Sequence, residues 1–156
     1  MSPLSPPLIK FMIPIIMWVL AFFSFIYAMI LKNKENRRIA EMLDNLEKVK
    51  HLKFAKEDFL KSDRILATGV VGGDIKLGDR YLFSFYPVSI IPYIYIQKMK
   101  VKISRRGKNG IIYYLDIALK RPFQNIKIDF AKEDVAEKVR EFSLERKKDL
   151  NEKIEY

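Results

Sequence analysis

The residues with the clearest chemical potential form a run of cations between positions 98 and 108. Six Lys or Arg side chains occur in these eleven residues with no acid among them: Lys98, Lys100, Lys102, Arg105, Arg106 and Lys108. Alternate residues of a strand point to one face, so the three lysines would share a face and the following turn would add the other cations. This pattern suits anionic lipid headgroups or an acidic protein partner. A solvated sheet face whose lysines protect an edge strand from aggregation would look the same.

Residue types that usually carry catalysis or bind metal ions are scarce. The chain has no cysteine, which excludes disulfides, thiolate catalysis and cysteine-based zinc sites, and it has one histidine, His51. His51 lies in a charged segment with a helical pattern, where we expect it to be exposed. A lone histidine in such a place does not predict a Ser–His–Asp set. We therefore predict no enzyme, and no catalytic, cofactor-binding or metal-binding residue.

The overall charge points to the same classes of partner as the cationic run. The formal net charge is +10, and the cations are spread along the chain rather than held in a tail. Such a charge suits an anionic membrane surface, a nucleic acid or an acidic protein. Nucleic acid is disfavoured because few aromatic rings accompany the cations: Tyr113 and Tyr114, if they alternate across a strand, offer one exposed ring. We expect membrane lipids and proteins as partners.

An apolar segment near the N-terminus predicts a membrane anchor. Residues 11–31 contain no charged side chain. As a helix these 21 residues span about 32 Å, close to the hydrocarbon thickness of a bilayer. A secretory signal peptide has a shorter apolar region and a small-residue cleavage site, neither of which is present. We predict a retained transmembrane helix that follows an extended, proline-rich leader at residues 1–10.

The flanks of this segment predict its orientation. After it come Lys32, Lys34, Arg37 and Arg38, whereas Lys10 is the only charged side chain before it. Positively charged flanks stay on the cytoplasmic side. We therefore expect the N-terminus outside and the C-terminal domain in the cytoplasm. The sequence leaves open whether the membrane is a bacterial inner membrane, a plasma membrane or an organellar inner membrane.

Residues 32–61 predict a juxtamembrane linker helix. Ile39, Met42, Leu46 and Val49 recur at helical spacing and form a narrow apolar stripe. Packing against the chain's own following domain is the simplest role for such a stripe. A short coiled coil, which would make a homodimer through residues 39–49, and contact with the membrane surface are the alternatives.

Residues 62–156 change to the two-residue period of β-strands. About six or seven short strands are separated by turns, among them "VGGD", "GD" and "RRGKNG". The segment "VSIIPYIYI", residues 88–96, is interrupted by Pro92 and is too short to span a bilayer. We expect it to be buried in the domain core; the alternative is a membrane-interface segment anchored by Tyr93 and Tyr95.

The C-terminal segment returns to a helical period. Val135, Val139 and Phe142 share one face, with acids at the beginning of the segment and cations near its end, as a helix dipole favours. Antiparallel strands followed by one covering helix predict a small α+β or barrel-like domain.

Four motifs carry a resemblance to a known family: "LGDRYLFSF" (77–85), "IIPYIYI" (90–96), "YYLDIAL" (113–119) and "IKIDFAKEDVAEKVREF" (126–142). Together they resemble the bacterial pleckstrin-homology-like (PH-like) domains, and the resemblance covers roughly half the chain. It implies a bent antiparallel sheet closed by a C-terminal helix, often in a membrane-tethered protein. The namesakes' phosphoinositide site lies in a basic loop near the first strands. Here that loop, "GVVGGDIKLGD", carries a single cation, Lys76. We therefore do not expect a phosphoinositide site in this chain.

These features predict a single-pass, membrane-anchored interaction or scaffold protein. Its cytoplasmic PH-like domain would bind protein partners or form an accessory subunit of a membrane complex. The alternative is an anionic-lipid sensor that presses the strand face of Lys98, Lys100 and Lys102 onto the inner leaflet. Neither hypothesis follows from the fold alone.

Overall fold

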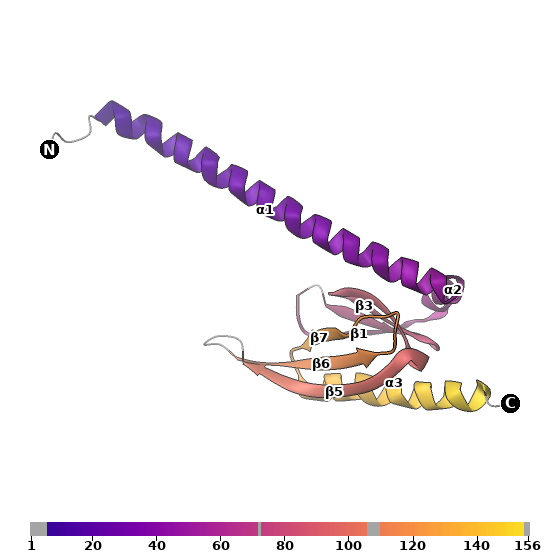
Figure 1. Cartoon of the computed structure of the whole chain (residues 1–156). Coiled ribbons are helices and arrows are strands. Elements are labelled where there is room, and N and C mark those ends of the chain that lie inside the picture. The colour runs from indigo at the N-terminus through magenta and orange to yellow at the C-terminus, as the bar shows by residue number, and fades with distance from the viewer. Residues whose placement is uncertain (1–5, 72, 106–109, 155–156) are drawn as a thin grey trace. The chain divides into compact units, whose positions relative to one another are not determined.

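The computed structural model describes residues 6–71, 73–105 and 110–154. The chain forms two compact units, Met1–Ala40 and Glu41–Tyr156. Helix α1 (Pro6–Lys48) begins in the first unit and ends in the second. It contains an apolar stretch that is long enough to cross a membrane, and none of that stretch is buried by the described residues. Figure 1 shows α1 as one long helix.

Helix α1 begins earlier than the sequence predicts. We expected an extended leader up to residue 10, but the backbone is helical from Pro6 onward. Proline is tolerated in the first turn of a helix because the N–H that it lacks would have no partner there. The further proline, Pro14, does not end the helix either.

The predicted linker helix is divided into two helices. The last turns of α1 belong to the second unit, and α2 (Leu52–Lys61) follows after a short break at which Lys50 adopts a positive φ of 60°. The apolar stripe packs on its own domain, as its simplest interpretation predicts: Leu46 is fully buried, and Met42 Sδ accepts a hydrogen bond from Ile90 N at 3.1 Å. Self-association through residues 39–49 stays a prediction.

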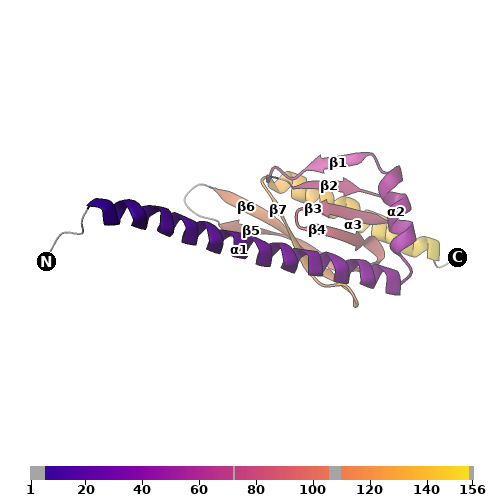
Figure 2. The same cartoon turned by 90° about the horizontal axis from the view of Figure 1, so that it is seen from above.

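Two small antiparallel sheets follow. The first has the order β1-β2-β3-β4, which Figure 2 shows side by side with α2 across one end. Its strands are β1 (Arg64–Ala67), β2 (Asp74–Leu77), β3 (Tyr81–Phe85) and β4 (Val88–Pro92). The second has the order β5-β6-β7. It is formed by β5 (Ile96–Arg105), β6 (Ile111–Leu119) and β7 (Ile126–Phe130), and a 3-10 turn, η1 (Tyr93–Tyr95), joins β4 to β5.

The C-terminal helix α3 (Glu133–Ile154) packs against the second sheet and η1. Val139 and Ala136 are fully buried on it. The predicted α+β class is confirmed, but the two sheets do not close into a barrel. The segment at residues 88–96 contributes to the core, since Ile91, Tyr93 and Ile96 are almost completely buried.

Candidate functional site

Three of the predicted cations share one face of β5. Lys98, Lys100 and Lys102 are exposed, whereas Met99 on the opposite face is buried. The register places Lys100 opposite Asp116 of β6, and Lys102 Nζ lies 2.7 Å from Asp116 Oδ2. Because an acid of the neighbouring strand pairs with Lys102, this face is less positive than the sequence of β5 suggests.

The other two lysines repel each other. The ammonium of Lys98 beside Lys100 lowers the pKa of Lys100, while the hydrogen bond to Asp116 raises the pKa of Lys102. Within the described residues, no acid is seen to pair with Lys98 or Lys100. Lys98 is still close enough to Asp116 to contribute, after Lys102 and Lys127, to the lowered pKa of that carboxylate.

The remaining predicted site residues are the cations of the turn after β5 and the cations that flank the membrane segment. Arg106 and Lys108 lie outside the described residues, as does the side chain of Arg105. The membrane-flank cations Lys32, Lys34, Arg37 and Arg38 all lie on α1, in the first unit.

A second surface, which the sequence did not predict, is an apolar groove in the second unit. The groove has a volume of about 650 Å³ and lies between the end of α1, helix α2 and the strands β3 and β4. The surface that its walls expose is almost entirely apolar. The walls are formed by Leu43, Leu52, Lys53, Ala55, Lys56, Phe59, Phe83, Ser84, Phe85, Val88, Ser89 and Ile90.

Aromatic side chains form the floor of this apolar groove. Tyr81, Phe83 and Phe85 alternate along β3 and so share the face toward α2, where Phe59 packs edge-on against Phe83 with ring centroids 5.1 Å apart. Phe85 retains 41% of its exposure and Leu43 retains 37%. The groove therefore presents apolar surface to solvent.

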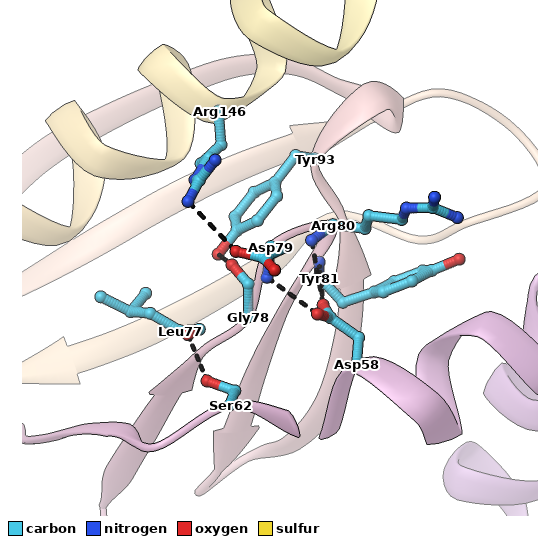
Figure 3. A network of polar contacts seen from close by, with 9 residues as sticks. All are labelled: Asp58, Ser62, Leu77, Gly78, Asp79, Arg80, Tyr81, Tyr93 and Arg146. Atoms are coloured by element: carbon cyan, nitrogen blue, oxygen red, sulfur yellow. Dashed lines mark hydrogen bonds and ion pairs between the residues drawn. The ribbon is translucent and has the colours of Figure 1, made fainter. Parts of the chain in front are cut away.

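A buried carboxylate fixes α2 against the first sheet. Asp58 accepts backbone hydrogen bonds at 2.9, 2.9 and 3.0 Å from Asp79, Arg80 and Tyr81, in the turn between β2 and β3 (Figure 3). Ser62, at the end of the same helix, donates to the carbonyl of Leu77. These contacts hold α2 in place as one wall of the groove.

The opposite side of this turn is held by two further residues. The Tyr93 hydroxyl donates to the Gly78 carbonyl at 3.2 Å, and Arg146 of α3 reaches Asp79 at 3.1 Å. Figure 3 shows Arg146 descending from α3 toward the turn. Burial raises the pKa of the Tyr93 hydroxyl, which keeps it protonated as a donor.

Sequence reasoning passed over Asp58, although a signal was present. An acid near the end of a helix is opposed by the helix dipole, so Asp58 gains nothing there from the helix itself. It shares a face with Ala55 and Ser62, three residues before and four after, and Ala55 is buried. An acid on the buried side of a short helix indicates a polar partner outside that helix.

The expectation for His51 is wrong. Instead of lying exposed within a helix, it stands just before α2 and is half-buried. Its Nδ1 lies 2.5 Å from the Tyr81 hydroxyl, and its ring contacts Tyr81 and Tyr95 edge-on. Burial first, and the Arg80 guanidinium second, lower the pKa of His51. The break between the two helices turns this side chain toward the sheet.

Comparison with known proteins adds no relative: no family model, curated protein or solved structure matches the chain. Among the described residues, no group of three or more His, Cys, Asp or Glu side chains is placed to hold a metal ion. The described residues thus present two distinctive surfaces, the basic face of β5 and the apolar groove.

Proposed function

We propose that this chain is a single-pass membrane protein whose folded unit binds protein partners in a membrane assembly. The observation that carries the proposal is the apolar groove: uncovered apolar surface that is rimmed by charged side chains is typical of interaction sites. The apolar stretch of α1 supports the membrane anchor by its length and composition.

The proposed topology places the N-terminus outside and the folded unit in the cytoplasm, because the cations gather after the apolar stretch. The cysteine-free chain allows a direct test with the variants Ser2→Cys and Tyr156→Cys. A membrane-impermeant maleimide applied to intact cells should label Ser2→Cys and leave Tyr156→Cys unlabelled until the cells are lysed. The reverse pattern would contradict the topology.

The proposed fold relationship is to the PH-like domains. What supports it is the order of elements: a four-stranded sheet, a three-stranded sheet and a C-terminal helix that packs on the second sheet. A phosphoinositide site is not part of the proposal, because Lys76 is the one cation between residues 69 and 79.

Partner binding through the groove is tested by purification of the full-length protein from its own membranes. Leu43→Asp and Phe85→Asp place a charge on exposed positions of the groove wall, so co-purifying proteins should be lost while the protein remains folded. Leu60→Asp is the control, since Leu60 is 71% exposed on α2, the helix that forms one wall, and does not line the groove. Equal recovery of partners with all three variants would exclude the groove as their binding site.

A second candidate function is contact with anionic lipid through the β5 face. The observation that favours it is the pair of adjacent ammonium groups on Lys98 and Lys100. We expect both lysines of the full-length protein to be protected from acetylation in vesicles that contain phosphatidylglycerol, but not in phosphatidylcholine vesicles. Added salt should reverse the protection, and Lys61 should react equally in both. Equal acetylation of Lys98 and Lys100 in both lipids would rule this function out.

A further inference from the structure

The walls of the apolar groove restrict the backbone conformation of whatever occupies it. Most of the surface that they expose is apolar, and a buried N–H or C=O without a hydrogen-bond partner is costly. An extended peptide would bring such groups against the wall. Strand addition at β4 is also obstructed, because the Ile90 N–H is already bonded to Met42 Sδ. A helix satisfies its own backbone and meets neither obstacle.

The charges at the groove are of one sign. Lys53 and Lys56 line it three residues apart on one face of α2, and no acidic side chain is among the described residues that line it. A third cation is close by, since Lys76 Nζ lies 4.0 Å from the centre of the Phe59 ring, which is part of the wall. An occupant with acids beside its apolar face would complement these lysines.

The open side of the groove favours a protein helix over a lipid chain. Phe85 and Leu43 are partly exposed at the wall, so an acyl chain lying there would stay partly in contact with water. An amphipathic helix covers the same surface and turns its polar side outward.

We propose that the apolar groove binds the apolar face of an amphipathic helix from a protein partner, with Asp or Glu residues three or four positions apart facing Lys53 and Lys56. This inference rests on the proposed function and names the class of partner segment. The aromatic floor of Phe59 and Phe83 receives the apolar anchors of that helix, and the two lysines set its orientation.

The test uses full-length protein in phosphatidylcholine nanodiscs and two designed, fluorescently labelled helical peptides with the same leucines at i, i+3, i+4 and i+7. One peptide carries glutamates beside the leucines and the other carries lysines. Fluorescence anisotropy should show the glutamate peptide binding at least about tenfold more tightly, as expected for two favourable charge pairs and the loss of two unfavourable ones. Equal binding, or no binding of either peptide, would overturn the inference.

A second experiment reverses the charge of the two lysines that line the groove. The double variant Lys53→Glu/Lys56→Glu should reverse the preference in favour of the lysine peptide, whereas Lys61→Glu, an exposed position on the same helix outside the groove, should not. Leu43→Asp should weaken the binding of both peptides. An unchanged preference in the double variant would contradict the assigned charge pairs. Displacement of the peptide by palmitate in the wild-type protein would contradict the choice of a protein helix over a lipid chain.

Failure of this inference and failure of the proposed function are distinguishable. If the glutamate peptide does not bind but Leu43→Asp removes the co-purifying proteins, the groove binds a partner of another kind and only the inference is wrong. If Leu43→Asp and Phe85→Asp both leave the co-purifying proteins in place, the groove is not their binding site, and partner binding through the groove is wrong together with the inference.

Discussion

Asp58 Oδ2 accepts a hydrogen bond from the backbone N–H of Tyr81 at 3.0 Å, across 23 residues of sequence. The same carboxylate binds the N–H groups of the two preceding residues. One side chain thus ties α2 to the turn between β2 and β3. Because α2 forms one wall of the apolar groove, the shape of the groove depends on this attachment.

Replacing Asp58 should destabilise the folded unit. Asp58→Ala leaves three backbone N–H groups without their acceptor, and we expect a loss of roughly 2–4 kcal/mol in the free energy of unfolding. Urea denaturation of the full-length protein in nanodiscs, followed by circular dichroism, measures this free energy. Glu57→Ala, which changes the exposed neighbouring acid, is the control. Equal midpoints for the two variants would refute this role of Asp58.

Gly78 should tolerate no side chain while Asp58 is present. A Cβ at position 78 would collide with the Asp58 carboxylate and would lie 2.9 Å from the Tyr81 carbonyl oxygen. We expect Gly78→Ala to be destabilising, and less so in the Asp58→Ala background, where one of the two collisions is gone. A double-mutant cycle by urea denaturation measures this coupling. Strict additivity would mean that the two residues do not meet in solution.

His51 should make the protein less stable in mild acid. Burial and Arg80 lower its pKa in the folded state, so the unfolded chain, with a pKa near 6.5, binds the proton more readily. The stability that comes from this difference in pKa is fully present above the pKa of the unfolded chain. It is lost as the pH falls through the lowered pKa of His51 in the folded state. His51→Phe keeps the ring beside Tyr81 and Tyr95 but cannot be protonated. The thermal midpoint of the variant should therefore decrease less between pH 7 and pH 5 than that of the wild type; parallel decreases would count against this effect.

The lysines of β5 should differ in chemical reactivity. Amines react in the neutral form, and Lys100 has a lowered pKa through Lys98, whereas Lys102 has a raised pKa through Asp116. Acetylation at pH 8.5, quantified by mass spectrometry, should therefore modify Lys100 faster than Lys102. Asp116→Asn should accelerate the acetylation of Lys102, and Lys98→Ala should slow the acetylation of Lys100. Rates that are unchanged in both variants would show that these electrostatic contacts are absent.

Much of the fold was predictable because it depends on local periodicity. The alternation of Tyr81, Phe83 and Phe85 predicts one strand face, and the spacing of Val135, Val139 and Phe142 predicts the apolar face of α3. Both predictions are confirmed. The break after Lys48 was missed because no glycine or proline marks it in the sequence. The packing of α2 on the first sheet decides where the helix ends, and it outweighs the weak intrinsic propensities.

The basic face of β5 was only partly predictable. The even-numbered lysines do share a face, since strand alternation decides it. Their pairing could not be read from β5 alone, because the register with β6 sets which acid meets which lysine. That register brings Asp116, 14 residues after Lys102, to within 2.7 Å of it.

By itself, the sequence determined the membrane-length apolar segment, the succession of short strands and the closing helix, since each is a pattern of neighbouring residues. Only the tertiary structure decided that Leu43, Phe59 and Phe83 meet in a groove, and that Asp58 supports its wall. The reason is physical: a groove and a buried hydrogen bond depend on which faces of distant elements pack together. That choice is set by the total free energy of the folded unit and not by any single stretch of chain.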